Sequence, residues 1–458
     1  MYIGLVDADL LCNGTRHPNL ALLKLAGFLN DNKIKFELIE SSEEDIERFD
    51  LIYISKVFSF TKDPAFVQEA KGTIFYNKFR FGGTGYYATI ENDNDFAIMR
   101  NSDMTCFDND SFLNSLPNHR GGKKMGIDIA RQMPYYNLYE NFVSKKIQSG
   151  KKASYYKDYL YYSIGFLTRG CFRKCPFCVN RLEKKVIQHS KLEWFLDNER
   201  DENGKLKRPY IYLWDDNFLA SPPKVWRSLL QQLIDSKRPF QFRQGLDERI
   251  IAESKYGEEI ASMLSKCKYH GDYIFAFDNW SDREKIIKAL KIWKKYNKRE
   301  TKFYLFCGFK LSYGDDKKLY QDIWEIFHRI KILMNYGCLG YIMRHEDYHK
   351  HELSNIYVQI ARWCNQPAFY KKMSFWEFCY RNQTFWEERT LNRKVIPLKS
   401  YEDFIKDKNK GYYNTTKMCL PLKTISTFID HFQEKKDELL EMFNYKLNDL
   451  ITPSLWEK

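Results

Sequence analysis

The sequence has no hydrophobic run long enough to cross a membrane and no segment that resembles a secretory signal. No apolar stretch approaches the roughly 18 residues that a membrane-spanning helix needs. Residues 1–7 include an aspartate and no basic side chain, whereas a signal peptide begins with basic residues. We therefore expect a cytoplasmic protein without a membrane partner.

The composition does not favour a disulfide framework or a disordered chain. The 11 cysteines are an odd number in a chain without a secretory signal, so we interpret them as intracellular thiols, some of them metal ligands. Low-complexity segments are absent, and a hydrophobic fraction of 44% is enough to form a core. Because 458 residues exceed one ordinary core, we expect two or three domains.

Positive charge is concentrated in the C-terminal two-thirds of the chain. Residues 1–150 hold 17 basic and 20 acidic side chains, and residues 151–458 hold 56 and 40. This balance indicates an anionic substrate or a nucleic acid as a partner. The alternative is a solvated lysine-rich surface, because uninterrupted blocks of Lys and Arg are absent.

Residues 1–140 alternate short apolar runs with a helical stripe, as a doubly wound (Rossmann-like) parallel sheet does. The helical stripe covers residues 17–29. Residues 141–157 are predicted to link this domain to the next. The expected strands are residues 2–6, 35–39, 51–55 and 73–76.

Residues 158–350 predict a full or partial (β/α)6 TIM-type barrel. Apolar runs recur about every thirty residues after a first, longer gap, and helical stripes such as 225–234 and 285–293 separate them. Residues 351–458 are expected to form a mostly helical extension, with a stripe at 425–443. The six predicted barrel strands are residues 161–167, 210–214, 240–242, 273–277, 303–306 and 338–343.

Three cysteines, Cys171, Cys175 and Cys178, follow the first predicted barrel strand. Their spacing would also line one face of a helix, but Gly170 and Pro176 argue against a helix there. Structural zinc is a second alternative, although it needs four ligands and no second cysteine pair lies nearby. Three thiolates leave one iron of a four-iron cluster open to a further ligand. The motif therefore predicts a 4Fe–4S cluster.

This Cys-x3-Cys-x2-Cys motif, with Phe177 just before the last cysteine, resembles that of the radical S-adenosylmethionine (radical SAM) superfamily. The resemblance implies a 4Fe–4S cluster whose open iron chelates S-adenosylmethionine. Reductive cleavage of that cofactor would then give a 5′-deoxyadenosyl radical. It also implies an electron donor such as a flavodoxin or ferredoxin, and it places Phe177 near the adenine.

Polar residues follow the other predicted barrel strands, at the face where barrel active sites form. A carboxylate at the second strand could hold the cofactor's ammonium group, although Asp-Asp-Asn departs from the family's common Gly-Gly-Glu. The substrate-contact candidates are Arg344, His345 and His349. Asp347, His349 and His351 also suggest a metal site, which a polar loop explains equally well. The remaining cofactor-binding candidates are Asp215, Asp216, Gln244, Asp278 and Gly308.

The order of a Rossmann-like domain and a barrel resembles the radical SAM subgroup that carries a cobalamin-binding-like domain. Members that ligate cobalamin through histidine have an Asp-x-His-x-x-Gly motif, whereas residues 1–157 contain only His17 and His119 and no such motif. We therefore favour a chain without cobalamin. Two alternatives stay open: a cobalamin-dependent radical SAM methyltransferase, and a non-catalytic iron–sulfur or zinc protein that binds nucleic acid through the aromatic and basic C-terminal part.

Overall fold

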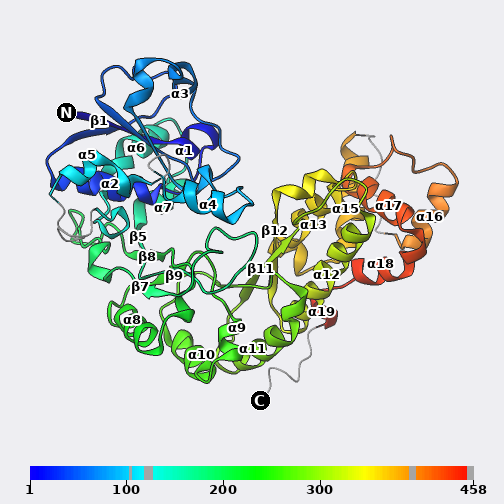
Figure 1. Cartoon of the computed structure of the whole chain (residues 1–458). Helices are drawn as coiled ribbons and strands as arrows, with labels where there is room; N and C mark the ends of the chain where they lie inside the picture. Colours follow the sequence, from blue (N-terminus) through cyan, green and yellow to red (C-terminus); the bar gives the residue numbers. More distant parts are fainter. Residues whose placement is uncertain (103–105, 118–126, 391–398, 451–458) are drawn as a thin grey trace. The chain divides into compact units, whose positions relative to one another are not determined.

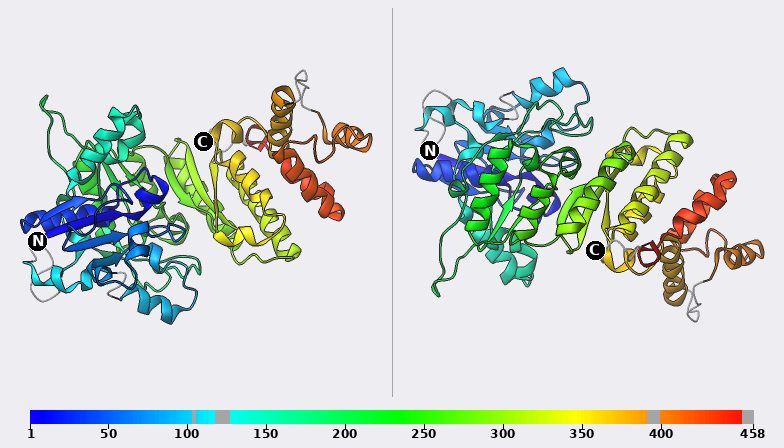
Figure 2. Two further views of the ribbon diagram at one scale, coloured as in Figure 1. Left: turned by 90° about the horizontal axis from the view of Figure 1, so that it is seen from above. Right: turned by 90° about the horizontal axis from the view of Figure 1, so that it is seen from below.

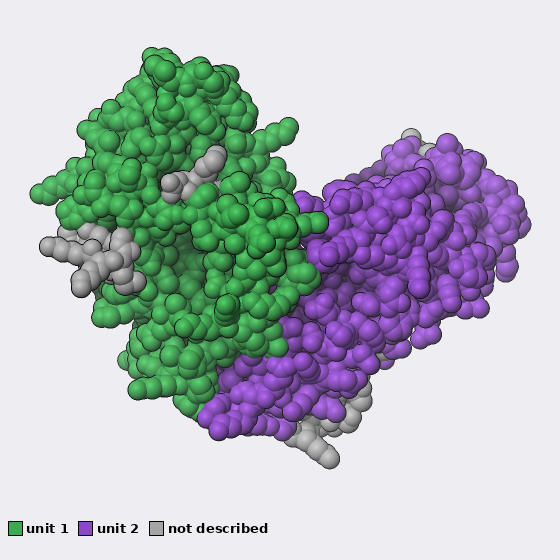
Figure 3. Space-filling view, in the orientation of Figure 1, with its two compact units in different colours: residues 1–244, 267–270 green, residues 245–266, 271–458 purple. Residues whose placement is uncertain are grey.

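The computed structural model of the chain describes residues 1–102, 106–117, 127–390 and 399–450. The chain divides into two compact units, coloured separately in Figure 3: unit 1 comprises residues 1–244 and 267–270, and unit 2 comprises residues 245–266 and 271–458. Among the described residues, no helix has both the length and the hydropathy that a membrane crossing requires.

Unit 1 begins with a four-stranded parallel sheet (Figure 1). The strand order β2–β1–β3–β4 is that of one common doubly wound arrangement. Every neighbouring pair is parallel, as expected for strands joined by helical crossovers. The strands are β1 (Tyr2–Asp7), β2 (Lys35–Leu38), β3 (Leu51–Ser55) and β4 (Phe79–Gly82).

Both faces of this sheet are covered, because successive side chains of each strand point to opposite sides. Ile3 and Leu5 pack with helices α2 (Leu20–Asp31) and α6 (Glu140–Gln148) in one core cluster. Ile52 and Ile54 pack with helix α3 (Ala65–Ala70) in another. The predicted α/β domain with a parallel sheet is thereby confirmed. The other short helices of this part are α1 (Ala8–Asn13), α4 (Asp93–Arg100), α5 (Ser111–Ser115) and α7 (Lys157–Tyr161).

The strand predicted at residues 73–76 is wrong: Ile74–Lys78 form a 3-10 helix, and the strand is β4 immediately after it. Thr73 starts the turn, since its hydroxyl donates to the carbonyl of Ala70 and accepts from the N–H of Phe75. Ile74 is 79% exposed, so this β-branched and aromatic run supplies no buried strand face. The sheet instead takes the following residues, in which Phe79 is buried.

Most of residues 141–157, the predicted linker, are helical. Phe142 and Val143 of α6 and Tyr156 near its end are buried in the core cluster that α2 forms with the first sheet. These residues therefore pack with α2 and the first sheet. The four domain boundaries proposed from the sequence stay a prediction.

The second sheet of unit 1 has three parallel strands in the order β5–β8–β9. Helix α8 (Pro223–Asp235) connects the last two strands and buries Trp226 and Leu230. A short antiparallel pair, β6 and β7, follows β5. The strands are β5 (Tyr162–Gly165), β6 (Thr168–Arg169), β7 (Ile187–Gln188), β8 (Tyr210–Leu213) and β9 (Phe240–Phe242).

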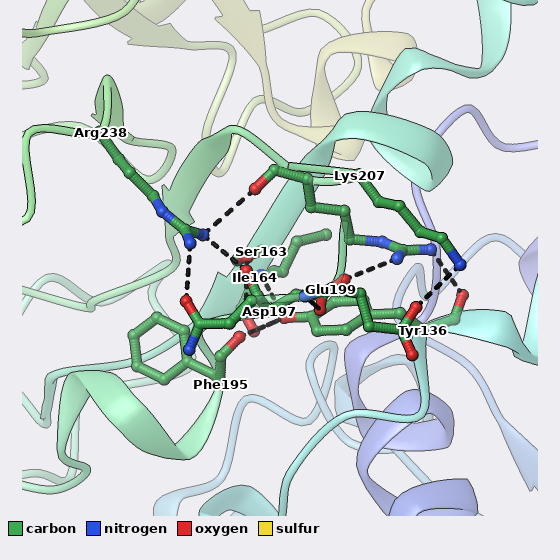
Figure 4. Close-up of polar contacts among 10 residues, drawn as sticks. Tyr136, Ser163, Ile164, Phe195, Asp197, Glu199, Lys207 and Arg238 are labelled. Carbon is green, nitrogen blue, oxygen red and sulfur yellow. Dashed lines mark hydrogen bonds and ion pairs between the residues drawn. The ribbon is translucent and has the colours of Figure 1, made fainter. Parts of the chain in front are cut away.

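A buried network of hydrogen bonds joins strand β5 to Tyr136 and to the segment around Phe195 (Figure 4). The hydroxyl of Tyr136 accepts from the N–H of Ile164 at 2.7 Å and donates to the carbonyl of Phe195 at 2.7 Å. Arg238 donates to the carbonyl of Asp197 at 2.6 Å on the same segment. These contacts set the position from which the cysteine loop departs.

Unit 2 contains a third parallel sheet, in the order β10–β11–β12. Helices precede and follow each strand along the chain, and the helices beyond residue 370, orange to red, lie together in both views of Figure 2. The strands are β10 (Tyr273–Ala276), β11 (Thr301–Cys307) and β12 (Leu339–Arg344). The helices among them are α9 (Arg249–Glu253), α10 (Gly257–Lys266), α11 (Arg283–Tyr296) and α12 (Asp316–Asn335).

The described part of residues 351–458 contains helices and no strand, as expected. The predicted stripe at 425–443 falls on two helices, because the chain turns at Phe432. The helices are α13 (Asn355–Cys364), α14 (Pro367–Tyr370), α15 (Phe375–Thr390), α16 (Tyr401–Asn409), α17 (Leu420–His431), α18 (Lys436–Phe443) and α19 (Leu447–Leu450).

All six strands predicted for the barrel region form. They lie in two three-stranded parallel sheets, one in each unit. The mixed α/β architecture with parallel sheets is therefore confirmed, whereas their closure into a full or partial barrel stays a prediction.

Candidate metal centre

The three cysteines lie on a loop that leaves β5 and is closed by the antiparallel pair of β6 and β7. In this pair Thr168 lies opposite Gln188. Cys171, Cys175 and Cys178 are half-buried and form no disulfide. Because the pair joins the two ends of the loop, the three thiols belong to one closed segment beyond the carboxyl end of β5.

Gly170 provides the entry to this loop. Its φ of +94° lies in the region that L side chains rarely adopt. A Cβ at this position would lie 2.4 Å from the carbonyl oxygen of Lys185 on the opposite arm. The glycine before the first cysteine is therefore required by its backbone conformation and by the close contact.

Asp215, just beyond strand β8, anchors the start of the loop. Its carboxylate accepts from the N–H of Leu167 at 3.1 Å, and from the N–H and the hydroxyl of Thr168, each at 2.6 Å. Burial raises the pKa of Asp215 to about 6. Its hydrogen bonds give this predicted cofactor-binding residue a role in holding the loop.

Asp216 and Asn217, which follow Asp215, also form hydrogen bonds with the loop. Asp216 accepts from the N–H of Gly170 at 2.8 Å, and its carboxylate lies 3.2 Å from Nε of Arg169. Asn217 donates from Nδ2 to Sγ of Cys171 at 3.3 Å. Three consecutive side chains thus hold successive points of the loop. The sequence did not assign these contacts, because they join residues about 46 positions apart.

Backbone N–H groups also point at the sulfurs. The N–H of Arg173 donates to Sγ of Cys171 at 3.4 Å, and the N–H of Asn180 donates to Sγ of Cys178 at 3.4 Å. Such donors stabilise negative charge on sulfur, which is the charge that a metal-bound thiolate carries. These hydrogen bonds therefore stabilise the thiolate forms of Cys171 and Cys178.

Burial, with a smaller contribution from the neighbouring Cys175 and Cys171, raises the pKa of Cys178 to about 11. In the metal-free chain this thiol is protonated at neutral pH. Since only the thiolate is a ligand, a bound metal would replace the proton and metal affinity would depend on pH.

The triad is not arranged around one ion. Across the described ranges, one group of at least three His, Cys and acidic side chains has ligand atoms within 4.8 Å of one another, and it is Asp316, His351 and Glu352. Zinc–sulfur bonds of about 2.3 Å in a tetrahedral site would bring thiolates to within about 4 Å. A four-iron cluster is larger and spaces its thiolates more widely, so the donor set fits a cluster better.

Helix α4 contacts the part of the loop that follows Cys178. Nε of Arg181 donates to Asp93 at 2.8 Å, and the Arg181 guanidinium lies 3.9 Å from the centre of the Phe96 ring. Arg100, the last residue of α4, pairs with Glu183. The loop is therefore fixed from two sides within unit 1.

The other two candidates of unit 1 differ in exposure. Phe177 is half-buried and lies between two of the cysteines in the chain. Gln244, two residues beyond β9, is exposed. Their predicted contacts with S-adenosylmethionine stay predictions.

The candidates of unit 2 follow its three strands. Burial raises the pKa of Asp278, beyond β10, to about 6. Beyond β11, the N–H of Gly308 donates to Asp322 at 2.7 Å, and a Cβ on Gly308 would lie 2.6 Å from Cβ of Tyr348. Tyr348 therefore lies close to the Gly308 backbone.

The substrate-contact candidates lie at the end of β12. Arg344 donates to the hydroxyl of Tyr348 at 2.9 Å. The N–H of His345 donates to the carbonyl of Cys307 at 2.9 Å, which places it beside the end of β11. The His349 ring lies 3.9 Å from the Tyr348 ring. The structure thus places Arg344 and His349 against Tyr348, whereas the His345 ring packs on Phe309. The roles of all three residues stay predictions.

The suggested metal group of Asp347, His349 and His351 does not form. Asp347 accepts from the N–H of Lys310 at 2.9 Å and lies 2.6 Å from Nζ of Lys350. His351 is fully buried and faces Asp316. Proximity in the sequence suggested the wrong partners for this histidine.

The described part of residues 1–157 has one histidine, His17, and His119 lies outside the described residues. The His17 ring is already engaged: Nδ1 pairs with Asp158, and Nε2 lies 3.2 Å from Arg243. This arrangement does not fit a cobalamin that takes His17 as its ligand.

The aromatic residues proposed to stack on nucleic acid are mostly core residues. Trp363, Phe375 and Trp376 are buried, and Phe369 is half-buried. Buried rings offer no face to a base. Core packing therefore accounts for most of these rings.

No family model matches the chain. A search of curated proteins also finds no relative.

The structure is similar to solved structures of the cobalamin-dependent S-adenosylmethionine radical enzyme OxsB. The form with aqua-cobalamin and S-adenosylmethionine and the form with aqua-cobalamin alone each give a TM-score of 0.45 at 14% identity, over 78% of this chain and 55% of that one. The apo form gives a TM-score of 0.33 at 12% identity, over 75% and 49%. This chain spans about half the length of the solved chains it matches. Two of those structures contain cobalamin, and our expectation that this chain binds none stays a prediction.

Proposed function

We propose that the chain is a radical SAM enzyme that binds a 4Fe–4S cluster through Cys171, Cys175 and Cys178. When bound, that cluster supplies the electron that cleaves S-adenosylmethionine to a 5′-deoxyadenosyl radical. The observation that carries the proposal is the closed three-thiol loop, whose sulfurs accept N–H donors. The radical would modify a substrate that the sequence does not identify, and a flavodoxin or ferredoxin would donate the electron.

The chain's own residues prepare the loop for this role. Asp215 and Asp216 fix the backbone before the first cysteine, and Arg181 fixes the backbone after the last. The N–H donors of Arg173 and Asn180 face thiolate charge without rearrangement. Three thiols without a fourth nearby cysteine leave one position for the carboxylate and amine of S-adenosylmethionine.

Anaerobic reconstitution with iron and sulfide tests the proposal directly. We expect about four irons and four sulfides per chain. Reduction in the presence of S-adenosylmethionine should then yield 5′-deoxyadenosine, measured by chromatography and mass spectrometry. A colourless chain with one tightly bound zinc on the triad would contradict the proposal.

Asn217 is expected to raise the reduction potential of the cluster. Its Nδ2 donates to Sγ of Cys171 at 3.3 Å, and such a bond favours the reduced, more negative state. Asn217→Ala should therefore shift the potential to a more negative value while iron content is retained, as followed by an EPR-monitored redox titration. Asn180→Ala is the matched control, because Asn180 donates from its backbone. Equal potentials in the two variants would refute this role.

A further inference from the structure

A second group of metal-binding side chains lies in unit 2. The ligand atoms of Asp316, His351 and Glu352 all lie within 4.8 Å of one another. Oδ1 of Asp316 is 3.3 Å from Nε2 of His351, and its Oδ2 is 2.9 Å from Nε2 of His431. One carboxylate therefore lies between two imidazole rings.

These side chains come from three separate segments. Asp316 is the first residue of helix α12, and His431 is the last residue of helix α17 (Figure 1). His351 and Glu352 follow the 3-10 helix Glu346–Lys350 beyond strand β12. The fold alone brings them together, so no local motif in the sequence marks the site.

The buried ring of His351 has an unsatisfied nitrogen that faces this group. Its side chain is fully buried, and Nε2 has no hydrogen-bond partner. Oδ1 of Asp316 is buried and equally unsatisfied. The two atoms face each other at 3.3 Å without the alignment of a hydrogen bond. Because buried polar atoms are nearly always satisfied, a cation between them would supply the missing interaction.

We propose that Asp316 and His351 bind a divalent zinc-type cation, and that His431, which faces the other oxygen of the same carboxylate, completes the donor set. Two imidazoles and one carboxylate are a common donor set for zinc, with water in the fourth position. Bonds of about 2.0–2.2 Å in a tetrahedral site separate the donors by about 3.3 Å. The 3.3 Å between Oδ1 of Asp316 and Nε2 of His351 matches that value, and His431 lies 2.9 Å from the other oxygen of the carboxylate. His431 and Asp316 are partly exposed, so the ion can enter from solvent.

Glu352 orients the buried ring in this site. Its Oε2 lies 3.4 Å from Nδ1 of His351, and the N–H of Leu353 donates to the same Nδ1 at 3.1 Å. When the metal takes Nε2, the single ring proton moves to Nδ1 and donates to Glu352. A protonated Nδ1 can no longer accept, so the hydrogen bond from the N–H of Leu353 is lost. A carboxylate behind a metal-bound histidine is the usual arrangement.

Zinc content of the full chain tests the site. We expect one zinc per chain, in addition to iron, after equilibrium dialysis of the reconstituted protein against buffered zinc, measured by elemental analysis. His431→Ala should weaken zinc binding at least about 10-fold, and Glu352→Gln by about 10- to 100-fold. Iron content should not change in either variant. His349→Ala is the matched control: the His349 ring packs on Tyr348, so its loss should leave zinc binding intact.

Two outcomes would overturn the proposal. One is a wild-type chain that retains no zinc beyond any bound to its cysteines. The other is zinc that is retained in His431→Ala and lost in Cys175→Ala, which would assign the metal to the cysteine loop. Since iron is measured in the same samples, failure of the iron–sulfur assignment and failure of this site are distinguished.

Discussion

Replacing Cys175 with alanine is expected to abolish cluster assembly and cleavage of S-adenosylmethionine. Two remaining thiolates cannot hold three corners of a four-iron cluster, so iron should fall from about four to less than one per chain. The EPR signal of the reduced cluster and the yield of 5′-deoxyadenosine should both disappear. Iron analysis, EPR and chromatography measure these changes.

The fold should survive this substitution. Cys175 is half-buried on a loop, and its neighbours Gly170, Asp215 and Arg181 keep their own contacts. Far-UV circular dichroism should therefore match the wild type. Cys12→Ala is the matched control: Cys12 is an exposed thiol of the same unit, and its loss should leave iron content unchanged. Full iron and activity in Cys175→Ala would refute the ligand assignment.

The cysteine motif and the barrel-region strands could be predicted because their signals are local. Three thiols within eight consecutive positions need no knowledge of the fold, and strands such as β8 and β11 are short apolar runs flanked by polar residues. The residues that complete the centre carry no such signal. Asn217 and Arg181 act through contacts with Cys171 and Asp93 that are distant in sequence.

The two predictions that were wrong, the strand at residues 73–76 and the partners of His351, have the same physical origin. Residues 73–76 have strand propensity, but whether a strand forms depends on burial, and Ile74 points into solvent. His351 was grouped with its sequence neighbours, whereas its ring faces Asp316 on another helix. In both cases the local structure depends on contacts with residues distant in sequence, and patterns within one sequence do not show those contacts.

Replacing Asp215 with alanine is expected to damage both stability and cluster assembly. The buried N–H groups of Leu167 and Thr168 and the Thr168 hydroxyl would lose their acceptor. Unsatisfied buried donors cost about 1–3 kcal/mol each, so we expect a loss of about 3–5 kcal/mol in unfolding free energy, after partial relaxation. Urea unfolding measures the loss, and iron content after reconstitution measures the effect on the loop.

Asp215→Asn separates the charge of this residue from its contacts. Burial raises the folded pKa of Asp215 to about 6 from its ordinary value of 3.8, so between these values the folded chain binds more protons than the unfolded chain. Its contribution to stability is therefore largest below pH 4 and is lost as the pH rises to about 6. The shift of about two pH units corresponds to about 3 kcal/mol.

Asparagine does not titrate, so unfolding free energy of the metal-free variant should fall less than that of the metal-free wild type between pH 4 and pH 6.5. The difference between the two chains should change by up to about 3 kcal/mol in favour of the variant. A difference that is constant across this range, or one that changes in favour of the wild type, would show that the Asp215 carboxyl is not held with a raised pKa. In that case solvent must reach the start of the cysteine loop, and the closed loop that carries the proposed function would not be as the structure places it.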